Sequence, residues 1–148
     1  MIMLFSLFLF FSLAVNATSI EYQSLGGADI TIEKNNHNFF LGDALGKVKR
    51  CDDSLVYCAD FKGFKIVTPK SFNKPLSHEL FDGTVVTYLP IKRSITILGE
   101  KLSGYTLSLK YKGEEFETTI FFNDQGVIYF SAFGSFYIAK DDEGYILN

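Results

Sequence analysis

The two cysteines have the most definite chemistry in this chain. Cys51 and Cys58 are the only cysteines among 148 residues. In an exported chain an even cysteine count predicts a disulfide, which here would close a short loop over Asp52, Asp53 and Ser54. Zinc-ligand cysteines usually have about two to four residues between them, and redox pairs have about two. Six residues lie between Cys51 and Cys58, and this wider spacing disfavours both. We predict a structural Cys51–Cys58 disulfide and no metal site.

The two histidines offer little support for catalysis. Ser77, His78 and Glu79 place a hydroxyl, an imidazole and a carboxylate next to one another, while His37 lies in an Asn-rich turn. A catalytic triad is defined by geometry, however, and adjacency in sequence does not point these groups at one another. The chain also lacks a GxSxG elbow, an HExxH motif and a phosphate-binding glycine loop. We therefore expect no enzyme, no catalytic residue and no cofactor.

An irregular segment at 69–83, PKSFNKPLSHELFDG, interrupts the strand pattern. It has two prolines and no sustained period, and long irregular segments of compact domains are often functional. We expect one short helical turn near its end, capped by Ser77.

The same segment supplies the candidate binding residues, Phe72, Lys74, His78 and Phe81. Aromatic anchors with charged neighbours are typical of protein interfaces. The alternative is that these apolar side chains only cap one end of the core.

Charge is unevenly distributed along the chain. Segment 44–75 carries seven Lys or Arg against three acidic residues, and segment 112–148 carries seven acidic residues against two lysines. These charges either face each other or decorate strand edges, or they form a dipolar surface that steers a charged protein partner. A net charge of −3 and the absence of a basic-aromatic motif argue against nucleic acid as the partner.

The candidate residues must be positioned by β-strands. Polar and apolar side chains alternate over 105–112 and 116–122, a period of two that indicates half-buried strands. A third strand is expected over 127–133, after a tight turn that ends at Gly126. The side chains predicted to be buried are Leu107, Leu109, Ile120, Phe122, Tyr129 and Phe133.

Shorter strands with the same spacing fill most of the remaining chain, including a hairpin over Lys62 and Gly63. We predict an all-β antiparallel meander that forms a small barrel or a two-layer sandwich. Phe121, Phe130 and Tyr137 fall on the second face of their strands. A second layer covers them, or they form a recognition patch.

The first residues, MIMLFSLFLFFSLAV, are almost wholly apolar and are followed by Asn16 and Ala17. Such a run is short for a membrane span and is typical of a signal peptide, which we place at 1–17. Residues 18–148 are then one β domain, periplasmic or secreted, with no stable membrane insertion after cleavage.

The sequence favours a small exported binding protein that acts non-enzymatically on a protein partner, of the inhibitor or immunity type. The alternatives are a β-barrel that binds a small molecule or lipid, and a small hydrolase that uses the segment 69–83.

Overall fold

Strands make up most of the chain in the computed structural model, which describes residues 19–34, 37–141 and 143–147. The expected signal peptide at 1–17 lies outside these residues. The strands are β1 (Ser19–Ser24), β2 (Ile30–Glu33), β3 (Asn38–Leu41), β4 (Ala44–Lys47), β5 (Lys49–Arg50), β6 (Val56–Asp60), β7 (Lys65–Pro69), β8 (Leu76–Glu79), β9 (Val85–Tyr88), β10 (Arg93–Ile97), β11 (Glu100–Lys110), β12 (Glu117–Asn123), β13 (Gly126–Ala132) and β14 (Ser135–Ala139).

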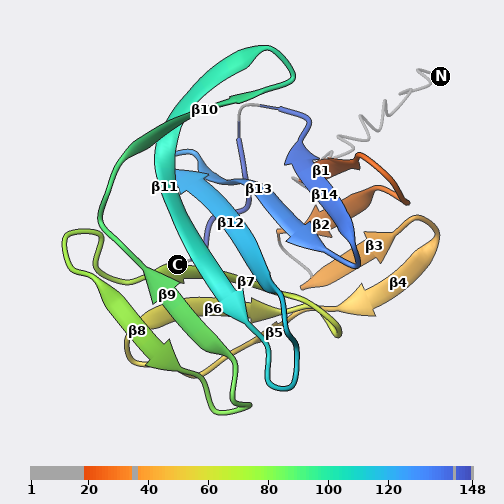
Figure 1. Ribbon diagram of the computed structural model, residues 1–148. Coiled ribbons are helices and arrows are strands. Elements are labelled where there is room, and N and C mark those ends of the chain that lie inside the picture. Colours follow the sequence, from red (N-terminus) through yellow and green to blue (C-terminus); the bar gives the residue numbers. More distant parts are fainter. Residues whose placement is uncertain (1–18, 35–36, 142, 148) are drawn as a thin grey trace, which may run out of the picture.

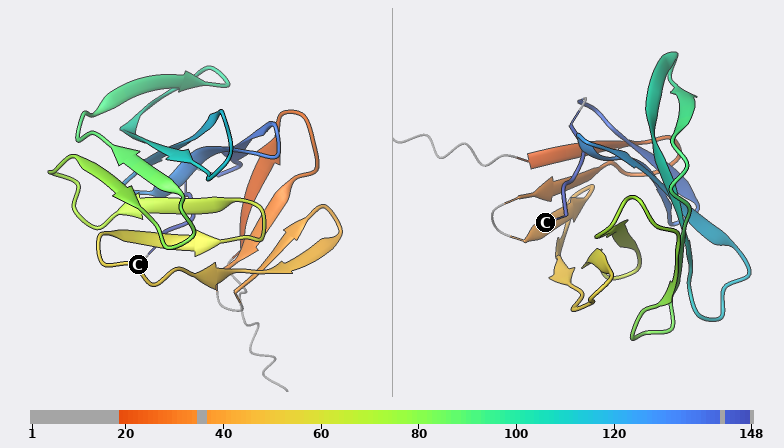
Figure 2. Two further views of the ribbon diagram at one scale, coloured as in Figure 1. Left: turned by 60° about the horizontal axis from the view of Figure 1, so that its bottom comes forward. Right: turned by 90° about the vertical axis from the view of Figure 1, so that its left-hand side faces the viewer.

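Within the described residues these strands form two antiparallel sheets. The larger has eleven strands in the order β4-β3-β2-β1-β14-β13-β12-β11-β9-β8, with β10 paired to the first half of β11. The smaller has the order β5-β6-β7. The large sheet curls around the small one but does not close on itself (Figures 1 and 2). The all-β prediction is confirmed, and the arrangement is a two-layer sandwich rather than a closed barrel.

The space between the two sheets is filled largely by aromatic rings. Phe64 of the small-sheet hairpin stacks against Phe61, with ring centroids 4.6 Å apart, and against Phe130 of β13, 5.4 Å away. Such packing buries a large apolar area. Four of the predicted core residues are buried in the same cluster, namely Leu107, Leu109, Ile120 and Phe122.

Tyr129 is not in this cluster, because β13 contains a bulge. The register passes from Phe121↔Tyr129 to Phe122↔Val127, which leaves Ile128 as one extra residue. An extra residue reverses the alternation of side chains beyond it. Tyr129 is therefore half-buried on the outer face, and the prediction that it belongs to the core is wrong.

Phe133 is also wrongly predicted, because it lies in a turn. Phe133 and Gly134 join β13 to β14 and both have positive φ angles, 52° and 71°. This is the backbone of a two-residue type I′ hairpin turn, which suits the twist of the flanking strands. The turn leaves the Phe133 side chain 53% exposed.

The rings expected on the second face are all covered. Phe130 and Tyr137 stack on each other in the core at 5.1 Å, because the bulge turns Phe130 inward. Phe121 is buried against Gly104, in the part of β11 that pairs with β10. A Cβ atom at Gly104 would lie 2.7 Å from the Phe121 ring, so glycine is what allows this approach. Phe121 is thus buried on the second face, as one of the two expectations required, whereas the placement of Phe130 and Tyr137 on that face is wrong because both belong to the core.

The two ends of the described chain meet inside the sandwich. β1 pairs with β14, the last strand. The Tyr22 hydroxyl of β1 donates to the Val127 carbonyl at 2.6 Å and accepts from the Tyr145 amide at 2.8 Å. Tyr145 forms an isolated bridge with Val127, so the terminal segment is tied down without forming a full strand.

The short helical turn expected within 69–83 is wrong. The described residues contain no helix, and β8 occupies Leu76–Glu79 as an edge strand paired with β9. Leu76 and His78 alternate with the exposed Ser77 and Glu79. Tertiary pairing with β9 thus overrides the local preference that suggested a capped turn.

Candidate functional site

The disulfide loop forms one wall of the candidate site. Cys51 and Cys58 are bonded, with Cα atoms 5.1 Å apart, and join the end of β5 to β6. The predicted disulfide is confirmed. At the tip of the loop, Asp53 Oδ1 accepts hydrogen bonds from the amides of Leu55 at 2.8 Å and Val56 at 3.1 Å. An aspartate that bonds amides two and three residues on closes a tight turn, so the loop has a defined shape.

His78 of β8 contacts this loop rather than its neighbours in sequence. Its Nε2 lies 2.7 Å from Asp53 Oδ2. Burial alone would raise the pKa of the Asp53 carboxyl, but hydrogen bonds from His78, Leu55 and Val56 hold that pKa below its usual value. The contact joins β8 of the large sheet to the loop of the small one.

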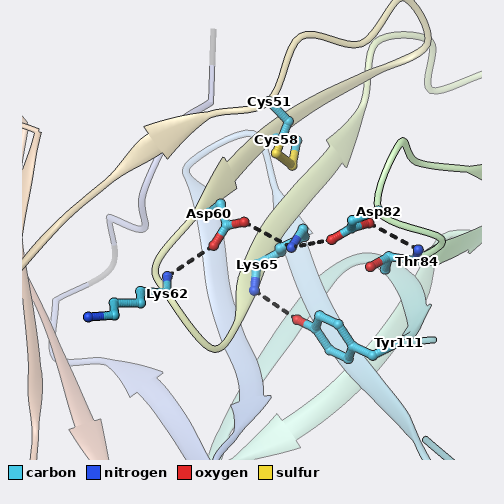
Figure 3. A network of polar contacts seen from close by, with 8 residues as sticks. All are labelled: Cys51, Cys58, Asp60, Lys62, Lys65, Asp82, Thr84 and Tyr111. Carbon is cyan, nitrogen blue, oxygen red and sulfur yellow. Dashed lines mark hydrogen bonds and ion pairs between the residues drawn. A yellow bond between two sulfur atoms is a disulfide. The ribbon is translucent and has the colours of Figure 1, made fainter. Parts of the chain in front are cut away.

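A second polar cluster lies beside the first and is centred on Lys65 of β7 (Figure 3). The Lys65 ammonium contacts Asp82 at 2.7 Å and Asp60 at 3.0 Å, and its backbone amide donates to the Tyr111 hydroxyl at 2.8 Å. The Lys65 side chain is only 11% exposed. Burial alone would lower the pKa of the ammonium, but the bonds to Asp82 and Asp60 raise it above its usual value.

This cluster fixes the β8–β9 hairpin relative to the small sheet. Asp82 lies in the hairpin turn, where its carboxylate also accepts from the Thr84 amide at 3.0 Å. Asp60 and Lys65 face each other across the β6–β7 hairpin. Partly buried ion pairs are weak evidence for stability, because desolvation offsets much of the attraction. Their effect here is to hold two elements in one relative position.

Between these clusters lies a hollow of about 470 Å³, which we call the charged hollow. Its lining residues are Lys49, Arg50, Cys51, Asp52, Asp53, Asp60, Lys65, Leu80, Phe81 and Asp82. Leu80 is buried, whereas the Phe81 ring at the rim is fully exposed.

The geometry of the β8–β9 turn explains why Phe81 is exposed. The Gly83 amide donates to the Leu80 carbonyl at 2.9 Å, and the Leu80 amide donates to the Thr84 carbonyl at 2.8 Å. Gly83 has a φ of 84°, which a three-residue hairpin loop requires at this position. The turn therefore presents Phe81 at its tip, and the Asp82–Lys65 contact anchors the same turn.

The four residues predicted from the sequence do not form one cluster. His78 lies in β8, and Phe81 lies in the turn that follows, at the rim of the charged hollow. Lys74 is exposed in the loop before β8. Phe72 lines a different hollow of about 290 Å³, and its ring centroid lies 5.8 Å from that of Phe122. The Tyr88 hydroxyl also donates to the Phe72 carbonyl at 2.9 Å. Phe72 thus partly covers the core.

Four polar residues of the two clusters were not predicted as site residues from the sequence, namely Asp53, Asp60, Lys65 and Asp82. The Asp60–Lys65 contact carried a usable signal, because the expected hairpin over Lys62 and Gly63 places residues 60 and 65 opposite each other. The contacts of Asp53 and Asp82 carried none, because they join elements that are distant in sequence.

Comparisons with protein-family models, with curated proteins and with solved structures found no significant match.

Within the described ranges, no three His, Cys, Asp or Glu side chains are placed together to hold a metal ion. The part of the chain that the structure describes also contains no helix able to span a lipid bilayer.

Proposed function

We propose that this chain is a small exported binding protein that acts non-enzymatically on a protein partner, of the inhibitor or immunity type. The observation that carries the proposal is Phe81, a fully exposed aromatic ring at the tip of a braced hairpin, beside a charged hollow. Large exposed apolar side chains with a polar rim are typical of interaction sites.

The bracing of the hairpin supports this proposal. The Lys65–Asp82 contact at 2.7 Å holds the turn, and the His78–Asp53 contact at 2.7 Å holds the strand that leads into it. An anchor residue on a rigid element loses less conformational entropy on binding than one on a mobile loop. Phe81 is therefore presented in a form suited to insertion into a partner's pocket.

Export is part of the proposal. A Cys51–Cys58 disulfide is typical of proteins that mature in an oxidising compartment, and the apolar run at 1–17 is typical of a signal peptide. Intact-mass measurement of exported material is expected to give a chain that starts near Thr18. A mass that includes Met1 would contradict the cleavage.

The barrel alternative receives no support, because the large sheet is not closed and stacked rings fill the space inside it. For the hydrolase alternative, the pair of side chains that comes closest to a catalytic arrangement is His78 with Asp53. Ser77 and Glu79 are exposed and alternate with His78 along β8.

Partner capture from the envelope and medium of the exporting cell tests the proposal. We expect the wild-type protein to retain one stoichiometric protein, and Phe81→Ala to lose it at an unchanged melting temperature. Phe116→Ala is the matched control, because Phe116 is 81% exposed in the β11–β12 loop. If Phe81→Ala retained the partner, the surface around Phe81 would not be the binding surface. A co-purifying lipid or small molecule would favour the ligand-binding alternative.

A further inference from the structure

The lysines of the basic segment 44–75 have different environments in the folded chain. Lys65 is held between two carboxylates. The Lys70 ammonium donates to the Asp53 carbonyl at 2.6 Å and lies 5.3 Å from the centre of the Tyr57 ring. These two positive charges are therefore occupied by contacts within the fold.

Three other lysines of the segment, Lys47, Lys49 and Lys62, remain exposed. None of the three has an ion-pair partner among the residues that the structure describes. All three line one hollow of about 560 Å³, which we call the lysine hollow. Its lining is completed by Leu45, Gly46 and Asp60.

Local structure brings the three lysines together. Lys47 ends β4 and Lys49 begins β5, and the buried Val48 between them leaves both ammonium groups on the solvent side. Lys49 pairs with Asp60, which places the β6–β7 turn and its Lys62 beside β5. The hollow therefore lies where the edge of the large sheet meets the edge of the small one.

Gly46, which also lines this hollow, lets the buried Phe39 ring pack closely against β4. A Cβ atom at this position would collide with the Phe39 ring, so the strand carries no side chain there.

Edge protection accounts for only part of this arrangement. Lysine on an edge strand discourages association with other sheets, and Lys47 and Lys49 lie on edge strands. Lys62 lies in a turn, yet its side chain lines the same hollow. Like charges that converge on one concave surface create a positive potential, which attracts anions and is strengthened by the low-dielectric walls.

We propose that the lysine hollow binds an acidic segment, rich in Glu or Asp, of the partner protein. This inference rests on the proposed function and names the chemistry of that partner. The lysine hollow shares Lys49 and Asp60 with the charged hollow, so one continuous surface runs from Leu45 to Phe81. Charge complementarity at the rim with an aromatic anchor at the other end is a common interface design.

An acidic protein segment fits better than a nucleic acid. The whole chain has a net charge of −3, and its segment 112–148 carries seven acidic residues against two lysines. A long polyanion would be repelled outside the hollow, whereas a short acidic segment would stay within it, where the one lining carboxylate, Asp60, is already paired with Lys65.

Titration with a short peptide tests the proposal without the unidentified partner. The probe is a labelled peptide of about eight residues, mostly glutamate, and the reference peptide carries glutamine instead. Wild type should bind the glutamate peptide more tightly at low salt. The variant K47Q/K49Q/K62Q should bind it about tenfold more weakly, because exposed ion pairs contribute a factor of about two to three each.

The control K92Q/K101Q/K110Q removes the same charge from exposed lysines outside the hollow and should change the affinity less than twofold. Three results would overturn the proposal. They are an unchanged affinity in K47Q/K49Q/K62Q, equal weakening in the control, and binding of a single-stranded oligonucleotide as tight as that of the peptide. Self-association of K47Q/K49Q/K62Q with unchanged peptide binding would assign these lysines to edge protection alone. The peptide titration uses no partner protein, so its result is independent of the capture experiment with Phe81→Ala.

Discussion

Removal of one hydroxyl group, by Tyr22→Phe, is expected to destabilise the whole sandwich. The Tyr22 ring is fully buried and packs edge-on against Phe130 at 5.0 Å. Burial raises the pKa of its phenol, so the group stays neutral and able to donate. Phenylalanine would keep the ring and its packing, and the substitution therefore isolates the two hydrogen bonds that join β1 to Val127 and Tyr145.

The magnitude follows from what those two partners lose. The Val127 carbonyl would lose a donor at 2.6 Å, and the Tyr145 amide would lose an acceptor at 2.8 Å. A buried group left unsatisfied costs about 1–3 kcal/mol. With two such groups, we expect Tyr22→Phe to lower the free energy of unfolding by about 2–6 kcal/mol, a large part of the roughly 5–15 kcal/mol that holds an ordinary domain together.

Urea unfolding followed by circular dichroism measures this loss. The matched control is Tyr129→Phe, which removes the same atom from a half-buried ring on the outer face and should cost less than about 0.5 kcal/mol. Hydrogen exchange should also show faster exchange of the Tyr145 amide in Tyr22→Phe. If Tyr22→Phe costs no more than Tyr129→Phe, the hydroxyl does not hold the C-terminal segment and the reasoning is refuted.

Four further outcomes are expected. Replacing both Cys51 and Cys58 with serine should lower the free energy of unfolding by about 2.5 kcal/mol and leave the fold intact, since the closed loop is short; urea unfolding checks this, and complete unfolding would contradict it. Phe122→Ala should cost about 3–5 kcal/mol in the same assay because it opens a cavity in the core, and a loss below about 1 kcal/mol would show that the ring is not core. Gly104→Ala should cost about 1–3 kcal/mol, because its methyl group would collide with the Phe122 carbonyl, and an unchanged melting temperature would contradict this contact. The pKa of the Asp53 carboxyl in the folded state lies below its usual 3.8, so the stabilisation from its hydrogen bonds is complete above that value and is lost as the pH falls through the folded-state pKa. Asp53→Asn should therefore flatten the decline of the urea midpoint below about pH 4, and an equally steep decline would contradict the assignment.

Local patterns were enough to predict the strands and the disulfide. The alternation around Leu107 and Ile120 placed both side chains in the core, where they are buried. The hairpin over Lys62 and Gly63 followed from turn chemistry, and both residues have the positive φ angles that such a turn requires. These features depend on neighbours within a few residues, which is the range that a sequence pattern describes.

Features that depend on distant partners were not predictable in this way. The bulge at Ile128 arises in the pairing of β13 with β12, and it moved Tyr129 to the outer face. The strand at Leu76–Glu79 exists because β9 pairs with it.

The candidate site shows the same division. Phe81 was predicted from its residue type, but the contact of His78 with Asp53 joins positions 25 residues apart and has no signature in the local sequence.

The pairing of β1 with β14 bears on when this chain can fold during synthesis. Tyr22 lies opposite Ala139 in the sheet, and its hydroxyl accepts a hydrogen bond from the amide of Tyr145, which is synthesised much later. At about 5–20 residues per second, a ribosome needs several seconds to deliver those partners, and until then β1 can pair only with β2. Contacts between the two ends also close the longest loop in the chain, which slows folding after release. The β1–β14 pairing and the contacts of Tyr145 therefore form only after nearly the whole chain has been synthesised, so the large sheet is completed late, whereas its local hairpins need no such delay.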